Sequence, residues 1–138
     1  RDMCKNHKID HLVRTTVLTY KICQSLNVNE YDTMVLLISA LLHDIGRKNN
    51  SNNIRHGEIG ACKAKQLLKD KKIFDIIKNH SIGDRNIKSE HKEMILILKD
   101  ADALERIRNN DLNVKYIRNK ESLCFIDFAK SLFSELKG

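Results

Sequence analysis

Proline is absent from the 138-residue chain, and glycine is scarce, with five residues. These two residue types are the strongest local breakers of helices. Strand-like alternation of apolar and polar residues is also hard to find, whereas the three- and four-residue spacing of amphipathic helices recurs along the chain. We therefore predict an all-α fold, a single compact bundle of about six helices that spans residues 1–138 as one domain.

Long apolar runs and a signal-peptide pattern are also missing. A membrane span needs roughly 20 consecutive apolar residues, and the longest apolar segment here is much shorter. We therefore expect a soluble, cytoplasmic protein that does not bind membranes. The sequence opens on Arg1 rather than on methionine, so we expect the natural chain to include residues before it.

None of the cysteines forms a CxxC pair with another. The four are scattered along the chain at Cys4, Cys23, Cys62 and Cys124. This spacing does not fit a zinc ribbon, and a chain of this size does not need a disulfide framework. We expect ordinary thiols.

The formal net charge is +7, and lysine supplies most of the basic residues. These cations are spread along the chain, aromatic residues are few, and no arginine-rich block is present. Nucleic-acid binding is therefore disfavoured, because it requires basic residues gathered on one face. A basic helical module that binds nucleic acid remains an alternative, but a positive charge also attracts a small anionic, phosphate-bearing substrate.

The most hydrophobic segment covers residues 34–42, which are all apolar except Ser39. A helix that is apolar on every side is a buried helix. His43 and Asp44 follow this segment directly, so we expect both to be carried inward. A buried, isolated carboxylate costs several kcal/mol unless a partner compensates for it. A divalent metal ion is the strongest candidate for that partner.

Helical periodicity and polar breaks predict six helices, at residues 8–26, 30–45, 56–70, 71–80, 90–108 and 119–136. The expected apolar face of the first comprises Ile9, Leu12, Val13, Val17, Tyr20 and Leu26. That of the last comprises Leu123, Ile126, Phe128, Leu132 and Leu136. Gly46 suits the position just past the second helix, and residues 49–53 are an asparagine-rich loop.

Two further polar residues bear on a metal site. His11 lies on the first predicted helix, and Asp102 interrupts an apolar stripe on the helix predicted at 90–108. A carboxylate set in an apolar stripe is expected to have a partner. Asp100 lies about 160° around the helix from Asp102, and we expect it to face solvent.

Two imidazoles and two carboxylates from three helices can form one mixed nitrogen–oxygen site. Such ligands suit Mn²⁺, Fe²⁺, Co²⁺, Ni²⁺ or Zn²⁺ and do not select among them. His56 and His80 add two imidazoles. His80 lies at the predicted C-terminus of a helix, where the helix dipole favours a histidine in any case, so it is either a cap or a ligand. Arg47 and Lys48 follow the His-Asp pair and are either anion-binding or simply solvated cations.

The ordered set of an early histidine, a His-Asp pair and a late aspartate resembles the HD-domain metal-dependent phosphohydrolase superfamily. The matching stretches read HLVR from His11, HDIGR from His43 and KDADALER around Asp102. The resemblance covers about residues 9–107 and implies that His11, His43, Asp44 and Asp102 bind the catalytic metal, with Mg²⁺ added to the candidate ions. Asp102 is chosen over Asp100 because it stands in the family's alanine-Asp-x-Leu context.

The resemblance also implies a reaction, hydrolysis of a phosphomonoester or phosphodiester by a metal-activated water. Asp44 would orient or deprotonate the water, and the cationic or imidazole groups that would meet the phosphate are His56, His80, Arg14, Arg47 and Lys48. The partner implied is a small phosphorylated substrate, nucleotides included. The oligomeric state is left open.

Two branches of the superfamily are disfavoured. The glycine-tyrosine-proline signature of the cyclic-di-GMP branch is missing, and Arg47 and Lys48 stand where the alarmone hydrolases have a Glu-Asp pair. A small, stand-alone hydrolase remains. The alternatives within the fold are an inactive metal- or nucleotide-binding module and an oxygenase with two irons, in which His56 and His80 serve the second metal.

Overall fold

The computed structural model describes the chain over residues 3–44 and 56–136, with side chains described for residues 9–44, 57–63 and 69–136. The described residues form six α-helices and four short 3-10 helices, without a β-strand among them. The α-helices are α1 (Met3–Ser25), α2 (Glu30–Leu42), α3 (His56–Leu68), α4 (Lys71–Asn79), α5 (Lys92–Leu104) and α6 (Ile126–Glu135). The 3-10 helices are η1 (Asp84–Asn86), η2 (Glu105–Asn109), η3 (Val114–Tyr116) and η4 (Lys120–Phe125). The predicted all-α class is confirmed.

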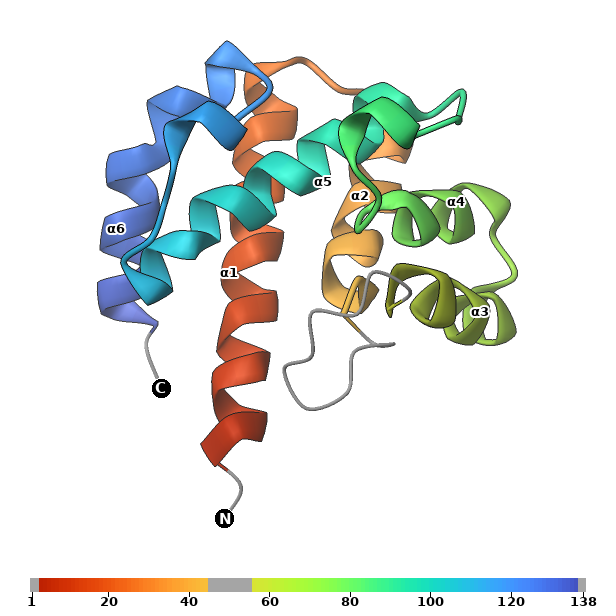
Figure 1. Ribbon diagram of the computed structural model, residues 1–138, viewed down its shortest axis with the longest axis horizontal. Helices are drawn as coiled ribbons and strands as arrows, with labels where there is room; N and C mark the ends of the chain where they lie inside the picture. The colour runs from red at the N-terminus through yellow and green to blue at the C-terminus, as the bar shows by residue number, and fades with distance from the viewer. Residues whose placement is uncertain (1–2, 45–55, 137–138) are drawn as a thin grey trace.

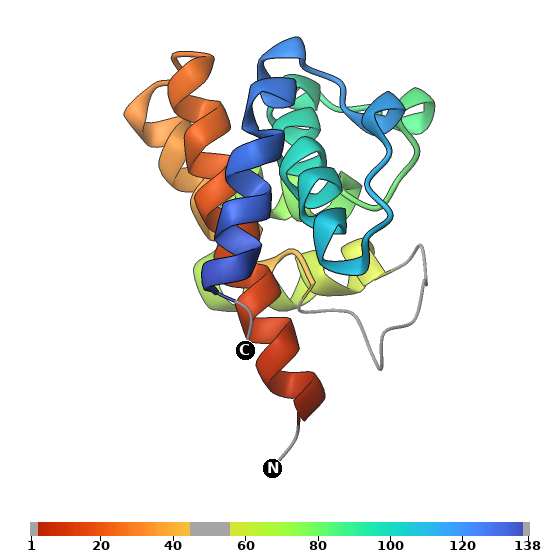
Figure 2. The same cartoon turned by 90° about the vertical axis from the view of Figure 1, so that its left-hand side faces the viewer.

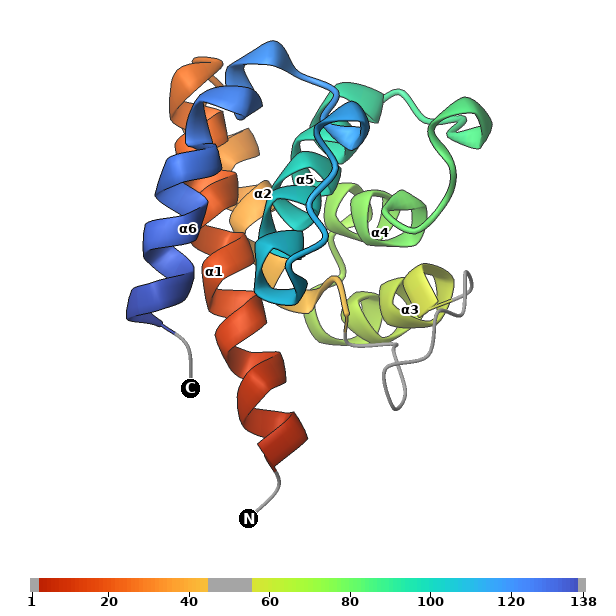
Figure 3. The same cartoon turned by 60° about the vertical axis from the view of Figure 1, so that its left-hand side comes forward.

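Helix α1 runs through the middle of the molecule, with α6 beside it on one side and α2 on the other (Figure 1). Helices α3 and α4 pack together beyond α2, and α5 crosses α1 (Figures 1 and 3). Seen from the side, α6 lies along α1 with the opposite chain direction (Figure 2). The α1, α2, α4 and α5 helices therefore surround one interior.

The core is aliphatic and draws on these four helices most. Its fully buried members include Leu18, Ile22, Leu36, Ile76, Ile77, Ile95, Leu98 and Leu104. Burying a side chain of this size stabilises the fold by about 1.5–3 kcal/mol. Among the described residues, no helix combines the length and the hydrophobicity needed to cross a bilayer. The described cysteines, Cys23, Cys62 and Cys124, are free thiols.

The inward face of α1 differs from the predicted one. Of the expected apolar face, Ile9 and Tyr20 are 51% and 45% exposed. The buried side chains are instead His11, Arg14, Thr15, Leu18, Thr19, Ile22 and Cys23. Val17 and Leu26 do pack against the core, but the prediction was wrong for Ile9, Val13 and Tyr20. Polar residues can face inward when their groups are satisfied; the Thr19 hydroxyl, for example, donates to the Thr15 carbonyl at 2.7 Å.

Helix α2 is buried on one side only, although its residues 34–42 are all apolar except Ser39. Val35, Leu36 and Ala40 are buried, while Met34 is 61% exposed and Leu41 47%. The prediction of a helix enclosed on every side was therefore wrong. The helix also ends at Leu42, with His43 as its C-cap, rather than at residue 45; the predicted Gly46 cap and the loop at 49–53 lie outside the described residues.

The end of the chain is less helical than predicted. Helix α5 ends at Leu104 and gives way to η2, and the helix predicted at 119–136 begins as η4 before α6. Of its expected core side, Leu132 is buried and Leu123 and Leu136 are exposed. The predicted helices at 56–70 and 71–80 are confirmed to within two residues by α3 and α4.

The expectation that Asp100 faces solvent was wrong. Its side chain is fully buried and accepts hydrogen bonds from the backbone N–H groups of Arg118 (2.7 Å) and Asn119 (2.9 Å). The Ser122 hydroxyl donates to it at 2.8 Å. Asp100 therefore ties α5 to the start of η4, which spacing along α5 alone does not reveal.

Candidate metal centre

His43 and Asp44 follow α2 at the point where its hydrogen-bonding pattern ends. The last carbonyls of a helix lack intrahelical partners, and the Nδ1 atom of His43 lies 2.6 Å from the Ala40 carbonyl oxygen. Nδ1–H is the donor in that contact, so the lone pair of the neutral ring lies on Nε2. His43 is fully buried and Asp44 is 4% exposed, as expected from the hydrophobic segment before them.

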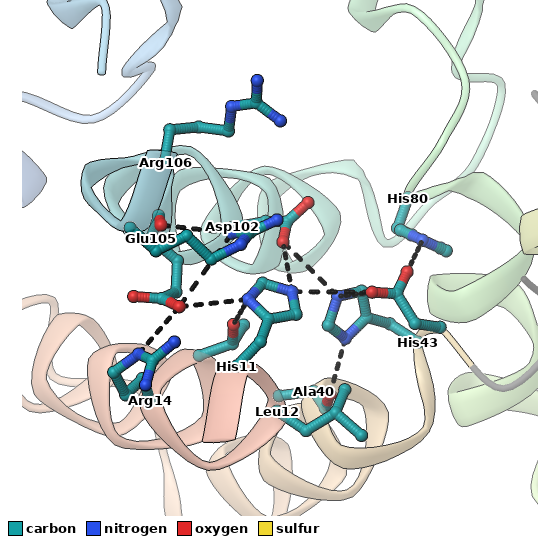
Figure 4. Close-up of polar contacts among 12 residues, drawn as sticks. His11, Leu12, Arg14, Ala40, His43, His80, Asp102, Glu105 and Arg106 are labelled. Atoms are coloured by element: carbon teal, nitrogen blue, oxygen red, sulfur yellow. Dashed lines mark hydrogen bonds and ion pairs between the residues drawn. The ribbon is translucent and has the colours of Figure 1, made fainter. Parts of the chain in front are cut away.

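His11 and Asp102 reach the same point from α1 and α5 (Figure 4). The Asp102 Oδ1 atom lies 3.3 Å from His11 Nε2 and 3.4 Å from His43 Nε2. The Asp44 Oδ2 atom lies 3.5 Å from His11 Nε2 and 3.4 Å from His43 Nε2. The structure thus brings together all four residues that the resemblance implied as metal ligands.

These distances suit a shared ion. Donor atoms bound to one ion at about 2.1 Å lie roughly 3.0–3.5 Å from each other. The ligand atoms of His11, His43 and Asp44 all lie within 4.8 Å of one another. The Nε2 atoms of both histidines are buried and make no hydrogen bond within the described part of the chain. A buried polar atom without a partner is costly, and a metal ion would satisfy both.

His80 lies beside Asp44 and is both a helix cap and a neighbour of the site. Its Nδ1 atom lies 2.6 Å from the Ile77 carbonyl oxygen at the end of α4, and its Nε2 atom lies 3.8 Å from Asp44 Oδ1. Gly57 permits this placement. A Cβ there would lie 2.6 Å from Ser81 Oγ and 2.8 Å from the Ile77 carbonyl, so α3 can approach the end of α4 only with glycine at this position.

Helix ends add to the electrostatics of the centre. Helices α2, α4 and α5 all terminate at its residues: His43 caps α2, His80 caps α4, and Asp102 lies in the last turn of α5. The carboxyl end of a helix carries roughly half a negative charge and favours a cation nearby. Three such ends and two carboxylates favour a cation here.

The pKa shifts of the histidines and carboxylates also indicate that the centre favours positive charge. Burial lowers the pKa of His11, but the adjoining carboxylates of Asp102, Asp44 and Glu105 outweigh burial and raise it to about 10. Burial raises the pKa of Asp44, but His11, His80 and the charge of His43 hold it well below its usual range. The pKa of Asp102 is likewise lowered, because His11 and His43 outweigh burial. Protons on the imidazoles supply this charge in the absence of an ion.

Arg14 is buried next to the centre. It is 3% exposed; its Nε donates to Glu105 Oε1 at 2.9 Å and its Nη1 to the Leu136 carbonyl at 2.8 Å. Its guanidinium is thus held by groups of the fold, and its predicted role as a phosphate ligand stays a prediction. Arg47 and Lys48 lie outside the described residues, as does the side chain of His56, so their predicted roles stay predictions.

Two charged residues near the centre were not singled out from the sequence. Glu105 is fully buried against His11; it falls on the same sequence stripe as Asp102, which was the available signal. Arg108 donates from Nη1 to the Glu105 carbonyl at 3.1 Å. Burial lowers the Arg108 pKa, while the carboxylates of Asp102, Glu105 and Asp44 oppose that shift. No sequence spacing singled out Arg108.

Fold and geometry together define an all-helical protein with a buried centre of imidazoles and carboxylates. The chain belongs to the HD domain family, whose model matches residues 9–107. Most members of this family are metal-dependent phosphohydrolases. No curated protein and no solved structure gave a match to the chain.

Proposed function

We propose that this protein is a metal-dependent phosphohydrolase that acts on a small phosphorylated substrate, nucleotides included. The observation that carries the proposal is the convergence of two carboxylates and two Nε2 atoms that make no hydrogen bond among the described residues, within a chain of the HD domain family. The residues that would hold the ion are His11, His43, Asp44 and Asp102. When bound, a divalent ion supplies polarisation of a phosphoryl oxygen and lowers the pKa of water.

The two oxygens of Asp44 have different neighbours, which suits two roles. Its Oδ2 faces the Nε2 atoms of His11 and His43, and its Oδ1 faces His80 Nε2 at 3.8 Å. Oδ2 therefore serves as a ligand, and Oδ1, with His80 next to it, accepts a hydrogen bond from the attacking water and so orients it. A group with this role must lie within hydrogen-bonding reach of the water proton.

The substrate phosphate requires positive charge on the open side of the centre. Asp102 is the accessible ligand, with its side chain 42% exposed. Arg108, whose side chain is 22% exposed, carries a guanidinium that interacts electrostatically with Asp102 and Asp44. We assign to Arg108 the neutralisation of phosphate charge that was expected of Arg14. Arg47 and Lys48 are retained as further candidates, and the net charge of +7 favours capture of an anion.

Hydrolysis assays test this function directly. Purified protein, stripped of metal and reloaded with Mn²⁺, Co²⁺, Ni²⁺, Zn²⁺ or Mg²⁺, is assayed on p-nitrophenyl phosphate, bis-p-nitrophenyl phosphate and nucleotides. We expect turnover with at least one ion, and an Asp102→Asn variant slower by more than about 100-fold, beyond the usual effect of residues that merely support a ligand. An Arg108→Gln variant should raise KM more than it lowers kcat.

The control is Asp100→Asn, which alters a buried carboxylate of the same helix that is bonded elsewhere. This variant should retain its turnover at temperatures where it is folded. Bound metal without turnover on any substrate would overturn the hydrolase and favour a metal- or nucleotide-binding module. Two iron ions per chain with oxygen consumption would instead favour the oxygenase alternative.

A further inference from the structure

Glu105 is a buried carboxylate shared by two partners on α1. It follows the last residue of α5 and is fully buried. Its Oε1 atom lies 3.2 Å from His11 Nδ1 and accepts from Arg14 Nε at 2.9 Å (Figure 4). Its Oε2 atom has no hydrogen-bond partner in the described part of the chain. Both described hydrogen bonds of this side chain therefore use the same oxygen.

The imidazoles of the centre obtain their Nδ1 partners in two different ways. His43 and His80 are helix caps, and each ring uses a carbonyl of its own helix, three residues back. His11 lies in the middle of α1, where the backbone carbonyls are already used by the helix. Its ring therefore needs an acceptor from elsewhere in the fold, and Glu105 supplies it across 94 residues of sequence. The Thr15 hydroxyl, at 3.4 Å, is the more distant neighbour of this nitrogen.

We propose that Glu105 is the positioning residue of His11. By accepting the Nδ1–H of the ring, it fixes the tautomer whose Nε2 lone pair faces Asp44 and Asp102, and it increases the basicity of that nitrogen. This inference rests on the proposed metal site and deepens it. Glu105 is fully buried and acts on the ion through His11; because its Oε1 also lies 3.9 Å from Arg108 Nη1, metal affinity rather than turnover isolates this effect.

Arg14 holds Glu105 in place and connects it to the end of the chain. Besides its bond to Glu105, the guanidinium donates to the Leu136 carbonyl and lies 4.9 Å from the centre of the Phe133 ring. A buried carboxylate is tolerated when it is paired and hydrogen-bonded. Helix α6, through Arg14, thus supports the orientation of His11.

The arrangement permits a graded pair of substitutions. Glu105→Gln retains an oxygen that can accept from His11 and Arg14, and its amide nitrogen takes the place of the oxygen that has no partner. It removes the charge while keeping the acceptor. Glu105→Met fills a similar volume and removes both. Asp100→Asn is the matched control, because Asp100 is another fully buried carboxylate of this region, with its partners on Arg118, Asn119 and Ser122.

The measurement is Co²⁺ affinity, determined by competition with a chelator of known affinity. We expect Glu105→Met to weaken Co²⁺ binding by about 10–100-fold, the effect typical of a carboxylate that supports a histidine ligand, and Glu105→Gln to weaken it less. Asp100→Asn should bind as the wild type does at temperatures where it is folded. In the Zn²⁺-loaded protein, the NMR signal of the His11 Nδ1–H proton should shift in Glu105→Gln and stay unchanged in Asp100→Asn.

Failure of this inference is distinguishable from failure of the proposed function. A wild type that binds no Co²⁺ would overturn the metal site, and the role of Glu105 with it. Wild-type affinity in folded Glu105→Met, alongside a wild type that binds, would overturn the role of Glu105 alone. If Glu105→Met does not fold, an unshifted Nδ1–H signal and unchanged affinity in Glu105→Gln would overturn that role.

Discussion

Helix α5 carries two aspartates two residues apart whose surroundings are opposite. Asp100 is fully buried and bonded to backbone and side-chain donors of the segment that leads into η4. Asp102 is 42% exposed, and its nearest polar neighbours are the Nε2 atoms of His11 and His43, which make no hydrogen bond within the described residues. The deeper carboxylate is the satisfied one.

The comparison shows that burial alone does not identify the carboxylate of the candidate metal centre. Asp100 has the donors that a buried carboxylate requires, so its burial serves the fold. Asp102 faces imidazole nitrogens that can act as acceptors or as metal ligands. What distinguishes the candidate metal centre is that potential ligand atoms from several helices lie at one point, where the two imidazole Nε2 atoms make no hydrogen bond among the described residues.

The largest effect is expected from the Asp102→Asn substitution, which tests whether Asp102, unlike Asp100, binds the metal ion. An amide is a poor metal ligand, so we expect Mn²⁺ affinity to fall by at least about 100-fold, equivalent to about 2.7 kcal/mol. At a free Mn²⁺ concentration of about 100 times the dissociation constant, binding raises the unfolding free energy of the wild type by about 2.7 kcal/mol. Thermal unfolding with and without Mn²⁺ measures this, and a variant that keeps the wild-type shift would remove Asp102 from the ligand set.

The Asp100→Asn substitution tests the structural role of the buried aspartate. An amide group cannot accept from all the donors that surround Asp100, and each buried donor left without a partner costs about 1–3 kcal/mol. We expect the free energy of unfolding to fall by about 2 kcal/mol, with Mn²⁺ affinity unchanged. Urea unfolding of the metal-free protein provides the first value, and a loss of metal affinity in the folded variant would show that the two aspartates act as one unit.

The sequence predicted which residues converge at the candidate metal centre better than it predicted how the helices pack. His43 and Asp44 follow an apolar segment, and Asp102 interrupts an apolar stripe, so contrast with the neighbours located them. The faces of α1 and α2 were predicted only in part. Polar side chains such as Thr19 hydrogen-bond to the backbone and face inward, while Met34 and Leu41 are exposed.

Long-range hydrogen bonds were beyond the reach of sequence patterns. Asp100 is bonded to residues 18–22 positions further along the chain, and Glu105 to residues more than 90 positions before it. Helical periodicity places a residue on a face of its helix but does not reveal which donors the rest of the fold brings to that face. This explains why Asp100 was expected in solvent.

Gly57→Ala tests whether the Asp44 side of the centre depends on close packing of α3 against α4. The added Cβ would lie 2.6 Å from Ser81 Oγ and 2.8 Å from the Ile77 carbonyl, next to His80. Overpacking of this kind costs about 1–3 kcal/mol, and we expect a loss near 1.5 kcal/mol together with slower turnover. The matched control is Gly83→Ala, whose Cβ would meet Asn86 Nδ2 at 3.9 Å and no other described atom within 4 Å; equal losses in the two variants would contradict the packing argument.

The smallest expected effect is a pH dependence of the unfolding free energy. It arises from the ion pairs that Asp84 makes next to Asp100. Lys99 of α5 and Arg118, the residue whose N–H is bonded to Asp100, both pair with Asp84, at 2.6 and 2.8 Å. Partial burial raises the pKa of Asp84, but these two cations outweigh it and lower the pKa to about 2. Because the folded pKa lies below the unfolded value of about 3.9, the pairing stabilises the fold fully above that value and is lost as the pH falls toward 2.

The magnitude is under about 1 kcal/mol, since the Asp84 side chain is 35% exposed and solvent screens the pairs. The measurement is the difference in unfolding free energy between the wild type and Asp84→Asn, from urea titrations between pH 6 and pH 2.5 or so. This difference should be constant above pH 5 or so and shrink below about pH 4, because a protonated Asp84 resembles the asparagine. If the difference in unfolding free energy persists at about pH 2.5, Asp84 acts through its shape rather than its charge. Asp100 would then be the carboxylate whose charge stabilises this part of the fold.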